Sequence, residues 1–201
     1  MKITKIERAK KNKLKVNIFL DGEYSFSVFE DVFLKEKITN GMDISDEFVQ
    51  KIKSLDLFES NKHYLLNILS KKNYTEKELY NKLYQRKLDK PAAKKLIEHI
   101  KKMGFLNDDK YMKDYFEYLV DSKKYSKMEI LFKMKMKFND DEKIRNIEEW
   151  LKDYDERDII NELLKKKFMN SDEKKRVSFF ARKGFKYDDI SCVLKKFNKE
   201  E

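Results

Sequence analysis

The sequence contains little of the residues that cross-link, break or anchor a chain. Its 201 residues include one cysteine, one proline and four glycines, and its apolar runs are short. A single cysteine excludes an internal disulfide and a cysteine metal cluster, and short apolar runs exclude a membrane-spanning helix. The basic N-terminus lacks the apolar core of a signal peptide. The sequence therefore predicts a cytoplasmic, helix-dominated protein with no membrane partner.

Motifs that mark common catalytic and cofactor sites are also absent. The sequence has no phosphate-binding glycine loop, no Cys-x-x-Cys and no His-Glu-x-x-His. His63 and His99 lie in separate predicted helices, and Cys192, between apolar residues, is expected to be a small buried thiol. We therefore expect no catalytic residue, no metal and no cofactor, and we look for function on the surface.

The charge is high and unevenly distributed. Charged residues make up 42% of the sequence, and the net charge is +10. Residues 61–106 carry a net charge of +8 and residues 157–201 carry +5, whereas residues 107–156 carry −3. A basic surface attracts polyanions, although only six of the 47 basic residues are arginine, so the lysine excess also fits a compositional bias. The acidic middle favours a partner of mixed charge.

The first 30 residues have the alternation of β-strands. Apolar residues alternate in 14–20 and again in 24–28, and Asp21-Gly22 between them predicts a hairpin. A two-residue loop would place the two apolar sets on opposite faces. Burial therefore favours a three-residue loop that ends at a left-handed Gly22 and pairs Ile18 with Tyr24.

Three further elements are expected in the N-terminal region. Ile3 and Ile6 indicate a third strand. A short helix follows the hairpin and ends at Asn40-Gly41. Ser45 then caps a second helix.

From about residue 61 the apolar period changes to 3.6, and nine helical segments follow. They form three triplets, and the middle helix of each begins with a capping phrase: Thr75-x-x-Glu78, Ser126-x-x-Glu129 and Asn170-x-x-Glu173. This recurrence in a helical chain predicts stacked repeats that form an elongated, curved body. The expected fold is mainly α, with a β-hairpin and helices in 1–60 and three-helix repeats in 61–106, 107–152 and 153–201.

The acidic pair Asp108-Asp109 follows Gly104-Phe105-Leu106 at the boundary between the first two repeats. Acidic side chains stabilise the first turn of a helix, and Asn107 or Asp108 can cap it. A catalytic or metal-binding pair is the alternative, but no histidine or third carboxylate lies nearby to complete a metal site. We therefore interpret the pair as part of a helix start.

Basic residues gather on or beside the middle helix of each predicted repeat. Stacking the repeats would align them into one track that contacts a partner, although lysines on solvated helix faces form similar patterns. The candidate contact residues are Lys82, Arg86, Lys87, Lys123, Lys124, Lys127, Lys133, Lys137, Arg176, Arg182, Lys183 and Lys186.

Three stretches of the sequence resemble the RecX family. They are YTEKELYNKLYQRKL at 74–88, KKMGFLNDDKYMKDYFEYL at 101–119 and FFARKGFKYDDISCVL at 179–194. The resemblance covers roughly residues 61–197, and the N-terminal sheet is similar to an extension found in part of the family. The sequence departs from the family at Tyr125, where glycine is typical, and at Met128, where a basic residue is typical.

The resemblance implies a non-enzymatic modulator of the RecA recombinase in recombination, DNA repair and the SOS response. Family members bind RecA, lie in the groove of its filament on DNA and limit filament growth or promote disassembly, which lowers ATP hydrolysis and strand exchange. We therefore expect a monomer that binds the RecA filament and, more weakly and electrostatically, single- and double-stranded DNA. Two alternatives stay open: a nucleic-acid-binding helical repeat that acts without RecA, and a protein scaffold.

Overall fold

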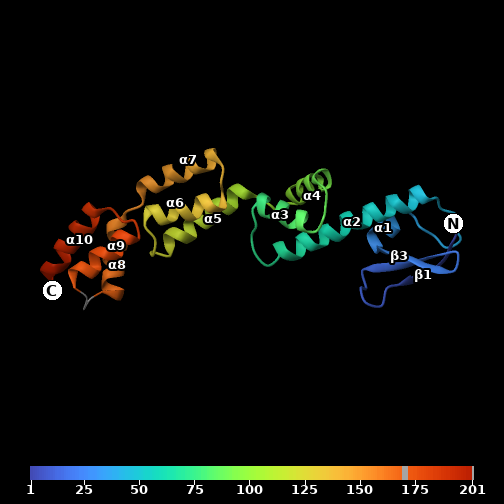
Figure 1. Cartoon of the computed structure of the whole chain (residues 1–201), viewed down its shortest axis with the longest axis horizontal. Coiled ribbons are helices and arrows are strands. Elements are labelled where there is room, and N and C mark those ends of the chain that lie inside the picture. Colours follow the sequence, from blue (N-terminus) through green and yellow to red (C-terminus); the bar gives the residue numbers. More distant parts are fainter. Residues whose placement is uncertain (169–171, 201) are drawn as a thin grey trace. The chain divides into compact units, whose positions relative to one another are not determined.

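The computed structural model describes residues 1–168 and 172–200. The chain divides into two compact units, Met1–Leu106 and Asn107–Glu201. In the described residues, the strands of the sheet all lie before residue 30 and the rest of the regular structure is helical (Figure 1). None of the described helices is both long and apolar enough to cross a membrane. The expected mainly α chain with a small N-terminal sheet is confirmed.

The N-terminal sheet is antiparallel, with the order β1 (Ile3–Arg8), β2 (Lys15–Leu20) and β3 (Glu23–Phe29). The third strand is therefore confirmed, but the predicted loop is wrong. Leu20 pairs with Glu23, which leaves a two-residue turn of Asp21 and Gly22 with φ of 49° and 94°. Two positive φ values are typical of the turn type that matches the twist of a hairpin.

An irregularity inside the hairpin aligns its two apolar faces. The register shifts between Ile18 and Phe19, so Ile18 pairs with Phe26 and not with Tyr24 as predicted. As the sequence indicated, burial of both apolar sets requires one more residue on one side of the hairpin than on the other. The structure places this unpaired residue in β3 and not in the loop. As a result Ile18 and Val28 are both fully buried.

The helix α1 (Glu30–Lys35) ends earlier than predicted. The prediction that this helix ends at Asn40-Gly41 is therefore wrong. Lys37 has a φ of 50°, and the next residue, Ile38, donates its N–H to the carbonyl of Phe33. This left-handed residue closes the helix end. Gly41 instead donates its N–H to the carbonyl of Ile3, 2.8 Å away, and so joins the edge of the sheet.

The helix α2 (Asp46–Leu69) crosses the predicted boundary at residue 60 without interruption. Ser45 caps it, as expected, by accepting a hydrogen bond from the N–H of Phe48. The sequence of α2 contains neither glycine nor proline, so nothing breaks it. Ile52 belongs to the core beneath the sheet, and Leu65 belongs to a second core with the next two helices. One long helix thus serves both cores of the first unit.

The first unit is completed by α3 (Glu76–Gln85) and α4 (Lys90–Lys102). Thr75 and Glu78 form the predicted capping box at the start of α3. The apolar stripes of the two helices meet α2 in a core that includes the fully buried Leu83 and Ile97.

The second unit consists of helices around one apolar core. Its elements are α5 (Asp108–Asp121), α6 (Lys127–Lys137), α7 (Asp141–Trp150), a 3-10 turn (Leu151–Asp153), α8 (Glu156–Lys167), α9 (Glu173–Arg182) and α10 (Tyr187–Glu200). The core runs through both predicted repeats of this unit, because Ile130 of α6, Ile160 of α8 and Phe180 of α9 belong to the same cluster.

Of the two remaining capping predictions, one is confirmed and one is wrong. Ser126 and Glu129 form the reciprocal box at the start of α6. The helix α9 is capped by Asp172, whose side chain accepts a hydrogen bond from the N–H of Lys175. The predicted cap, Asn170, lies outside the described residues.

The Gly-Phe pairs at 104–105 and 184–185 both close the ends of helices. After α9, the N–H of Gly184 bonds to the carbonyl of Ala181, and the N–H of Phe185 bonds to that of Phe180. Gly184 has a φ of +80°, and the rings of Phe185 and Phe180 meet edge to face at 5.4 Å. This is the left-handed helix end that favours glycine. A Cβ at Gly184 would also overlap the methyl group of Met128.

We predict that Gly184→Ala destabilises the second unit. An L-residue in the left-handed region costs about 1–2 kcal/mol, and Met128 must move as well. Urea unfolding followed by the fluorescence of Trp150, which lies in this unit, measures the effect. The control is Lys123→Gly at another left-handed helix end, with a φ of 49°. Glycine relieves the backbone there, and this gain opposes the loss of the exposed ion pair with Glu162, so the variant should unfold at about the same urea concentration. Equal midpoints for Gly184→Ala and the unaltered protein would contradict the prediction.

Candidate interaction surface

The acidic pair Asp108-Asp109 begins a helix, as interpreted from the sequence. Asn107 is the cap of α5 and accepts a hydrogen bond from the N–H of Lys110 at 2.9 Å. Both aspartates lie in the first turn, and the ammonium of Lys143 is 3.7 Å from Asp108 and 3.5 Å from Asp109. Both carboxylates are therefore stabilised by the helix N-terminus and by the ammonium of Lys143.

One predicted contact residue is buried inside the second unit. Arg176 is buried, donates hydrogen bonds to the carbonyl of Phe168 and to the side chain of Asn198, and lies over the ring of Phe197. The expectation that Arg176 lies on the contact surface is therefore wrong. The neighbouring lysines in the sequence suggested an exposed residue, but Arg176 lies on the inward face of α9.

Arg86 joins α3 to α2 although it is exposed. Its Nε donates to the Oδ1 of Asn61 at 2.6 Å, and its guanidinium lies 4.3 Å from the ring centre of Tyr64. Asn61 is fully buried, and its own amide donates to the carbonyl of Leu57. An altered Arg86 would leave a buried amide oxygen without its donor, which is costly.

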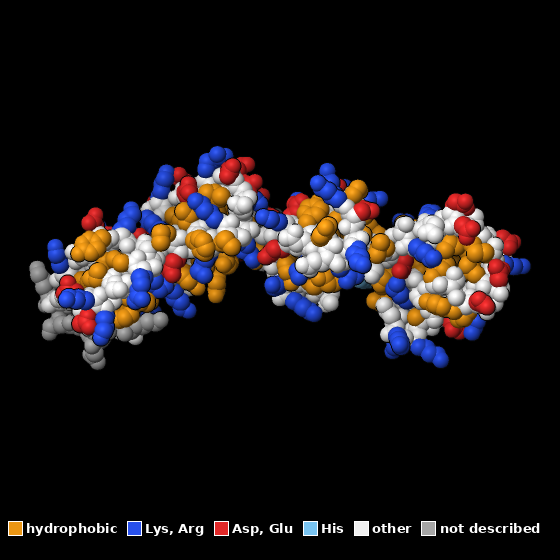
Figure 2. All heavy atoms as spheres, viewed as in Figure 1, with side chains coloured by type: hydrophobic (Ala, Val, Ile, Leu, Met, Phe, Trp, Pro, Cys, Tyr) orange, Lys and Arg blue, Asp and Glu red, His pale blue; other side chains and the backbone are white. Residues whose placement is uncertain are grey.

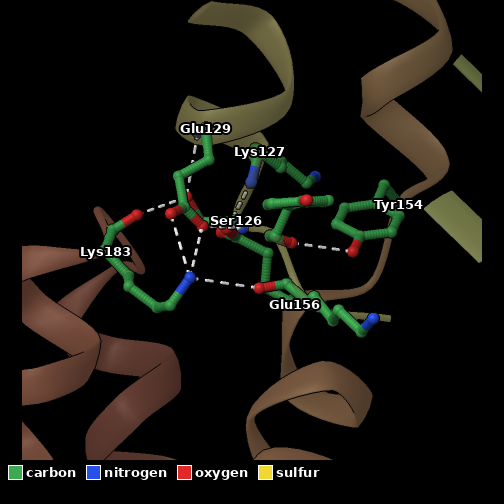
Figure 3. A network of polar contacts seen from close by, with 8 residues as sticks. Ser126, Lys127, Glu129, Tyr154, Glu156 and Lys183 are labelled. Atoms are coloured by element: carbon green, nitrogen blue, oxygen red, sulfur yellow. Dashed lines mark hydrogen bonds and ion pairs between the residues drawn. The ribbon is translucent and has the colours of Figure 1, made fainter. Parts of the chain in front are cut away.

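Lys183 belongs to a polar network that links the start of α6 to the end of α9 (Figure 3). Its ammonium donates to both carboxylate oxygens of Glu129, at 3.0 and 3.1 Å, and to the carbonyl of Lys124. The hydroxyl of Ser126 donates to the carbonyl of Lys183 at 2.5 Å. The capping box of α6 is therefore part of the packing between the second and third predicted repeats.

The same network extends to the start of α8 (Figure 3). The N–H of Lys127 donates to Glu156 at 2.8 Å, and the hydroxyl of Tyr154 donates to the carbonyl of Tyr125. Burial raises the pKa of Glu156, although the bond from Lys127 opposes that shift. Burial also raises the pKa of Tyr154 to about 12. The side chains of Glu156 and Tyr154 thus hold backbone segments together. The ammonium of Lys127 also has an intramolecular partner, because it donates to the carbonyl of Lys152.

Three candidate lysines are half-buried over tyrosine rings. Lys82 lies 5.1 Å from the ring centre of Tyr74, Lys133 lies 4.8 Å from Tyr125, and Lys137 lies 5.1 Å from Tyr111. An ammonium over an aromatic face gains about 0.5–1 kcal/mol at an exposed site. Tyr125, which stands where the family typically has glycine, does not have a positive φ and is used as a platform for Lys133.

The other candidate cations are exposed, but they differ in whether they have an intramolecular partner. Lys123 is exposed but bonds to Glu162 at 2.5 Å, which raises the pKa of the lysine. Lys87, Lys124, Arg182 and Lys186 are exposed. We call these four the exposed cations. On the face that Figure 2 draws, basic, acidic and apolar side chains intermix, and no single sign of charge covers a large area.

An exposed apolar ridge on α6 was not among the residues predicted from the sequence. Met128, Phe132 and Met136 recur every four residues and are 59%, 65% and 74% exposed. The opposite face of the helix holds the buried Ile130 and Met134. The lysines of α6 are half-buried between these two faces, so the most exposed line of the helix is apolar. The spacing of four residues between these apolar side chains is visible in the sequence and indicates one line along a helix.

The sequence also singled out a cysteine and a histidine. Cys192 is half-buried, so the expectation of a buried thiol is only partly met. His99 is exposed beside the ring of Phe58.

Comparison with known proteins relates both units to one family. The family model described as the regulatory protein RecX N-terminal domain matches residues 1–45, so the likeness includes the N-terminal sheet. A regulatory protein RecX of Clostridium beijerinckii is 31% identical over 206 residues, which cover 97% of this chain and 95% of that protein. One of Clostridium perfringens (strain 13) is 28% identical and covers 100% of this chain and 98% of its own.

Two solved structures have a similar fold. A crystal structure of a regulatory protein RecX has a TM-score of 0.68 and 21% identity, and the match covers 96% of this chain and 98% of that one. A crystal structure of RecX from Lactobacillus salivarius has a TM-score of 0.58 and 20% identity, and covers 72% of this chain and 98% of its own. With a relative that is 31% identical along nearly all of both chains, the chain belongs to the RecX family of regulatory proteins.

Proposed function

We propose that this chain is a regulator without enzymatic activity, and that it binds RecA filaments on DNA and limits their growth. ATP hydrolysis and strand exchange by RecA then fall. The observation that carries the proposal is the likeness, along almost the whole chain, to proteins named regulatory protein RecX. The accessible groups of this chain support a binding role, because they include both exposed cations and an exposed apolar ridge.

The proposed contact residues differ in how many intramolecular contacts they would lose when they bind a partner. Lys87, Lys124 and Lys186 are exposed and can meet a phosphate or a carboxylate of the filament directly. Arg182 is exposed too, but its Nε donates to the carbonyl of Ser178 at 3.2 Å, and it gives up this bond when it turns to a partner. Lys82, Lys133 and Lys137 can also reach a partner, but they leave a tyrosine ring when they do so. Arg86 and Lys183 hold the fold, and reversing their charge would confound a test of binding.

The ridge on α6 is the second proposed contact. Its side chains gain by leaving water, at about 25 cal/mol per Å² of apolar area buried. The half-buried lysines beside it restrict the choice of partner surface to one that is apolar and bordered by acidic groups. Such a surface belongs to a protein and not to a nucleic acid backbone, so we assign the ridge to the recombinase and the exposed cations to DNA or acidic loops.

We predict that reversing the exposed cations, with Lys87, Lys124, Arg182 and Lys186 each changed to Glu, raises the concentration needed to halve the ATPase activity of RecA on single-stranded DNA. Exposed ion pairs contribute about 0.2–1 kcal/mol each, and 1.4 kcal/mol is tenfold in affinity. The expected rise is therefore roughly tenfold or more, and it should shrink at high salt.

The matched control reverses four other exposed lysines, Lys10, Lys11, Lys13 and Lys53, and so makes the same change in net charge. This variant should remain within about twofold of the unaltered protein, because only general charge is lost at exposed sites. Equal effects of the two variants would contradict the proposed contacts. Salt-dependent DNA binding with no effect on RecA in the unaltered protein would instead favour the alternative that acts on nucleic acid alone.

We also predict that Phe132→Gln with Met136→Gln weakens regulation of RecA while the melting temperature stays nearly unchanged. Both side chains are exposed in the free protein, so their loss removes little folding energy. Burying one such side chain in an interface contributes about 1.5–3 kcal/mol, which corresponds to at least a tenfold rise in the half-inhibitory concentration. The effect should persist at high salt, unlike that of the exposed cations.

The control for the ridge is Leu34→Gln on α1, where the side chain is 63% exposed. It removes a similar exposed apolar group from the first unit and should leave regulation unchanged. Inhibition of RecA by the ridge variant at the same concentrations as the unaltered protein would show that α6 contacts something else or nothing.

A further inference from the structure

Three side chains of the first unit converge between α1 and α2. Asp31 lies in the first turn of α1, while Glu59 and His63 lie one turn apart on α2. A carboxylate oxygen from each acid and one imidazole nitrogen all lie within 4.8 Å of one another. Glu59 and His63 are half-buried and Asp31 is exposed, so the group opens to solvent on one side. Nothing in the interaction surface described above uses these residues.

The surrounding contacts hold this group in place. The ring of His63 stacks on Phe29, with centroids 4.7 Å apart and planes 19° from parallel. Phe29 is fixed in turn, because its N–H donates to Asp56 at 2.8 Å and the ammonium of Lys15 lies over its ring. Phe29 directly precedes α1, which carries Asp31. The imidazole and the first turn of α1 are thus tied to the same aromatic residue.

Glu59 already has a cationic partner in this arrangement. Its Oε2 is buried and forms an ion pair, without a hydrogen bond of suitable geometry. The ammonium of Lys62, one turn along the same helix, is the counter-charge of this oxygen. A divalent cation that binds this oxygen directly would displace the Lys62 ammonium and supply the counter-charge in its place.

We propose that Asp31, Glu59 and His63 bind a divalent transition-metal ion, for which Zn²⁺ is the best match. One imidazole nitrogen and two carboxylate oxygens are ligands that zinc accepts at about 2.0–2.2 Å, and a water molecule can complete four-coordination. Mg²⁺ and Ca²⁺ prefer sites made only of oxygen. The ligand atoms need to close by about 1 Å to reach zinc, and Asp31 is the exposed side chain that can move.

The bound ion acts as a cross-link between α1 and α2. It joins the helix that follows the hairpin to the long helix that serves both cores of the first unit. Ligands that bind only the folded state stabilise it in proportion to their concentration. Zinc therefore raises the melting temperature of the unaltered protein. This inference is independent of the proposed regulation of RecA, because it concerns binding of a metal alone.

The test is calorimetric titration of the full chain with Zn²⁺, together with the visible absorption of the Co²⁺ form and the melting temperature with and without zinc. We expect one site. His63→Gln and Asp31→Asn should each weaken binding at least tenfold, and Asp31 is exposed, so its variant folds even if that of His63 does not. Lys62→Gln should tighten binding several-fold, because it removes the competing ammonium.

Two variants serve as matched controls. His99→Gln alters the other histidine of the sequence, and Cys192→Ser alters its single thiol. Both should bind zinc as the unaltered protein does. The proposal is overturned if the unaltered protein binds no zinc at 100-fold molar excess, if Asp31→Asn and His63→Gln bind normally, or if binding is lost with His99 or Cys192. Unchanged or weaker binding by Lys62→Gln would refute the role given to the ammonium.

Discussion

The unpaired N–H groups at the starts of the helices must all find acceptors, and most of this fold depends on how they do so. The helices α2 to α9 each begin after a residue whose side-chain oxygen accepts a hydrogen bond from the first turn. These caps fix where each short helix starts and therefore which apolar residues face inward. Replacing such a cap by alanine typically costs about 1 kcal/mol. The acidic phrases of the sequence are explained by this requirement and need no catalytic role.

The ends of the helices impose the complementary constraint, and lysine often meets it. Left-handed residues close several of them, and at Lys37, Lys87 and Lys123 the residue is not glycine. A lysine at such a position has a backbone role in addition to its charge. Lys183 and Arg86 have structural roles of another kind, through Glu129 and Asn61. Some cations of this chain hold helices, others remain for a partner, and Lys87 does both, so counting charges cannot separate the two roles.

The two units present different chemistry to their surroundings. The second unit carries the apolar ridge of α6, which the core does not need because the opposite face of the helix already fills it. An apolar line that stays in water is costly for a free protein and useful for one that binds another protein. The first unit places a histidine and two acids between α1 and α2. Under our proposal, a metal ion bound by this group stabilises the packing of α1 on α2.

Sequence patterns determined the elements that depend on local chemistry. The capping boxes at Thr75 and Ser126, the cap at Ser45 and the apolar stripes of the helices follow from neighbours within one or two turns, so the sequence alone predicted them. The RecX resemblance followed from similar local phrases, such as the Gly-Phe pairs that close helices.

Tertiary structure decided everything that depends on distant residues. The hairpin register was set by the twist-matched turn together with burial against α2, whereas the register predicted from the sequence rested on burial alone. The continuity of α2 across residue 60 was decided by two cores that share one helix. Arg176 and Lys124 look alike in sequence, yet one is buried and the other exposed, because burial depends on which face of a helix meets the rest of the fold. Likewise, Asp31 and His63 are 32 positions apart in sequence, and only the packing of α1 on α2 brings their side chains together.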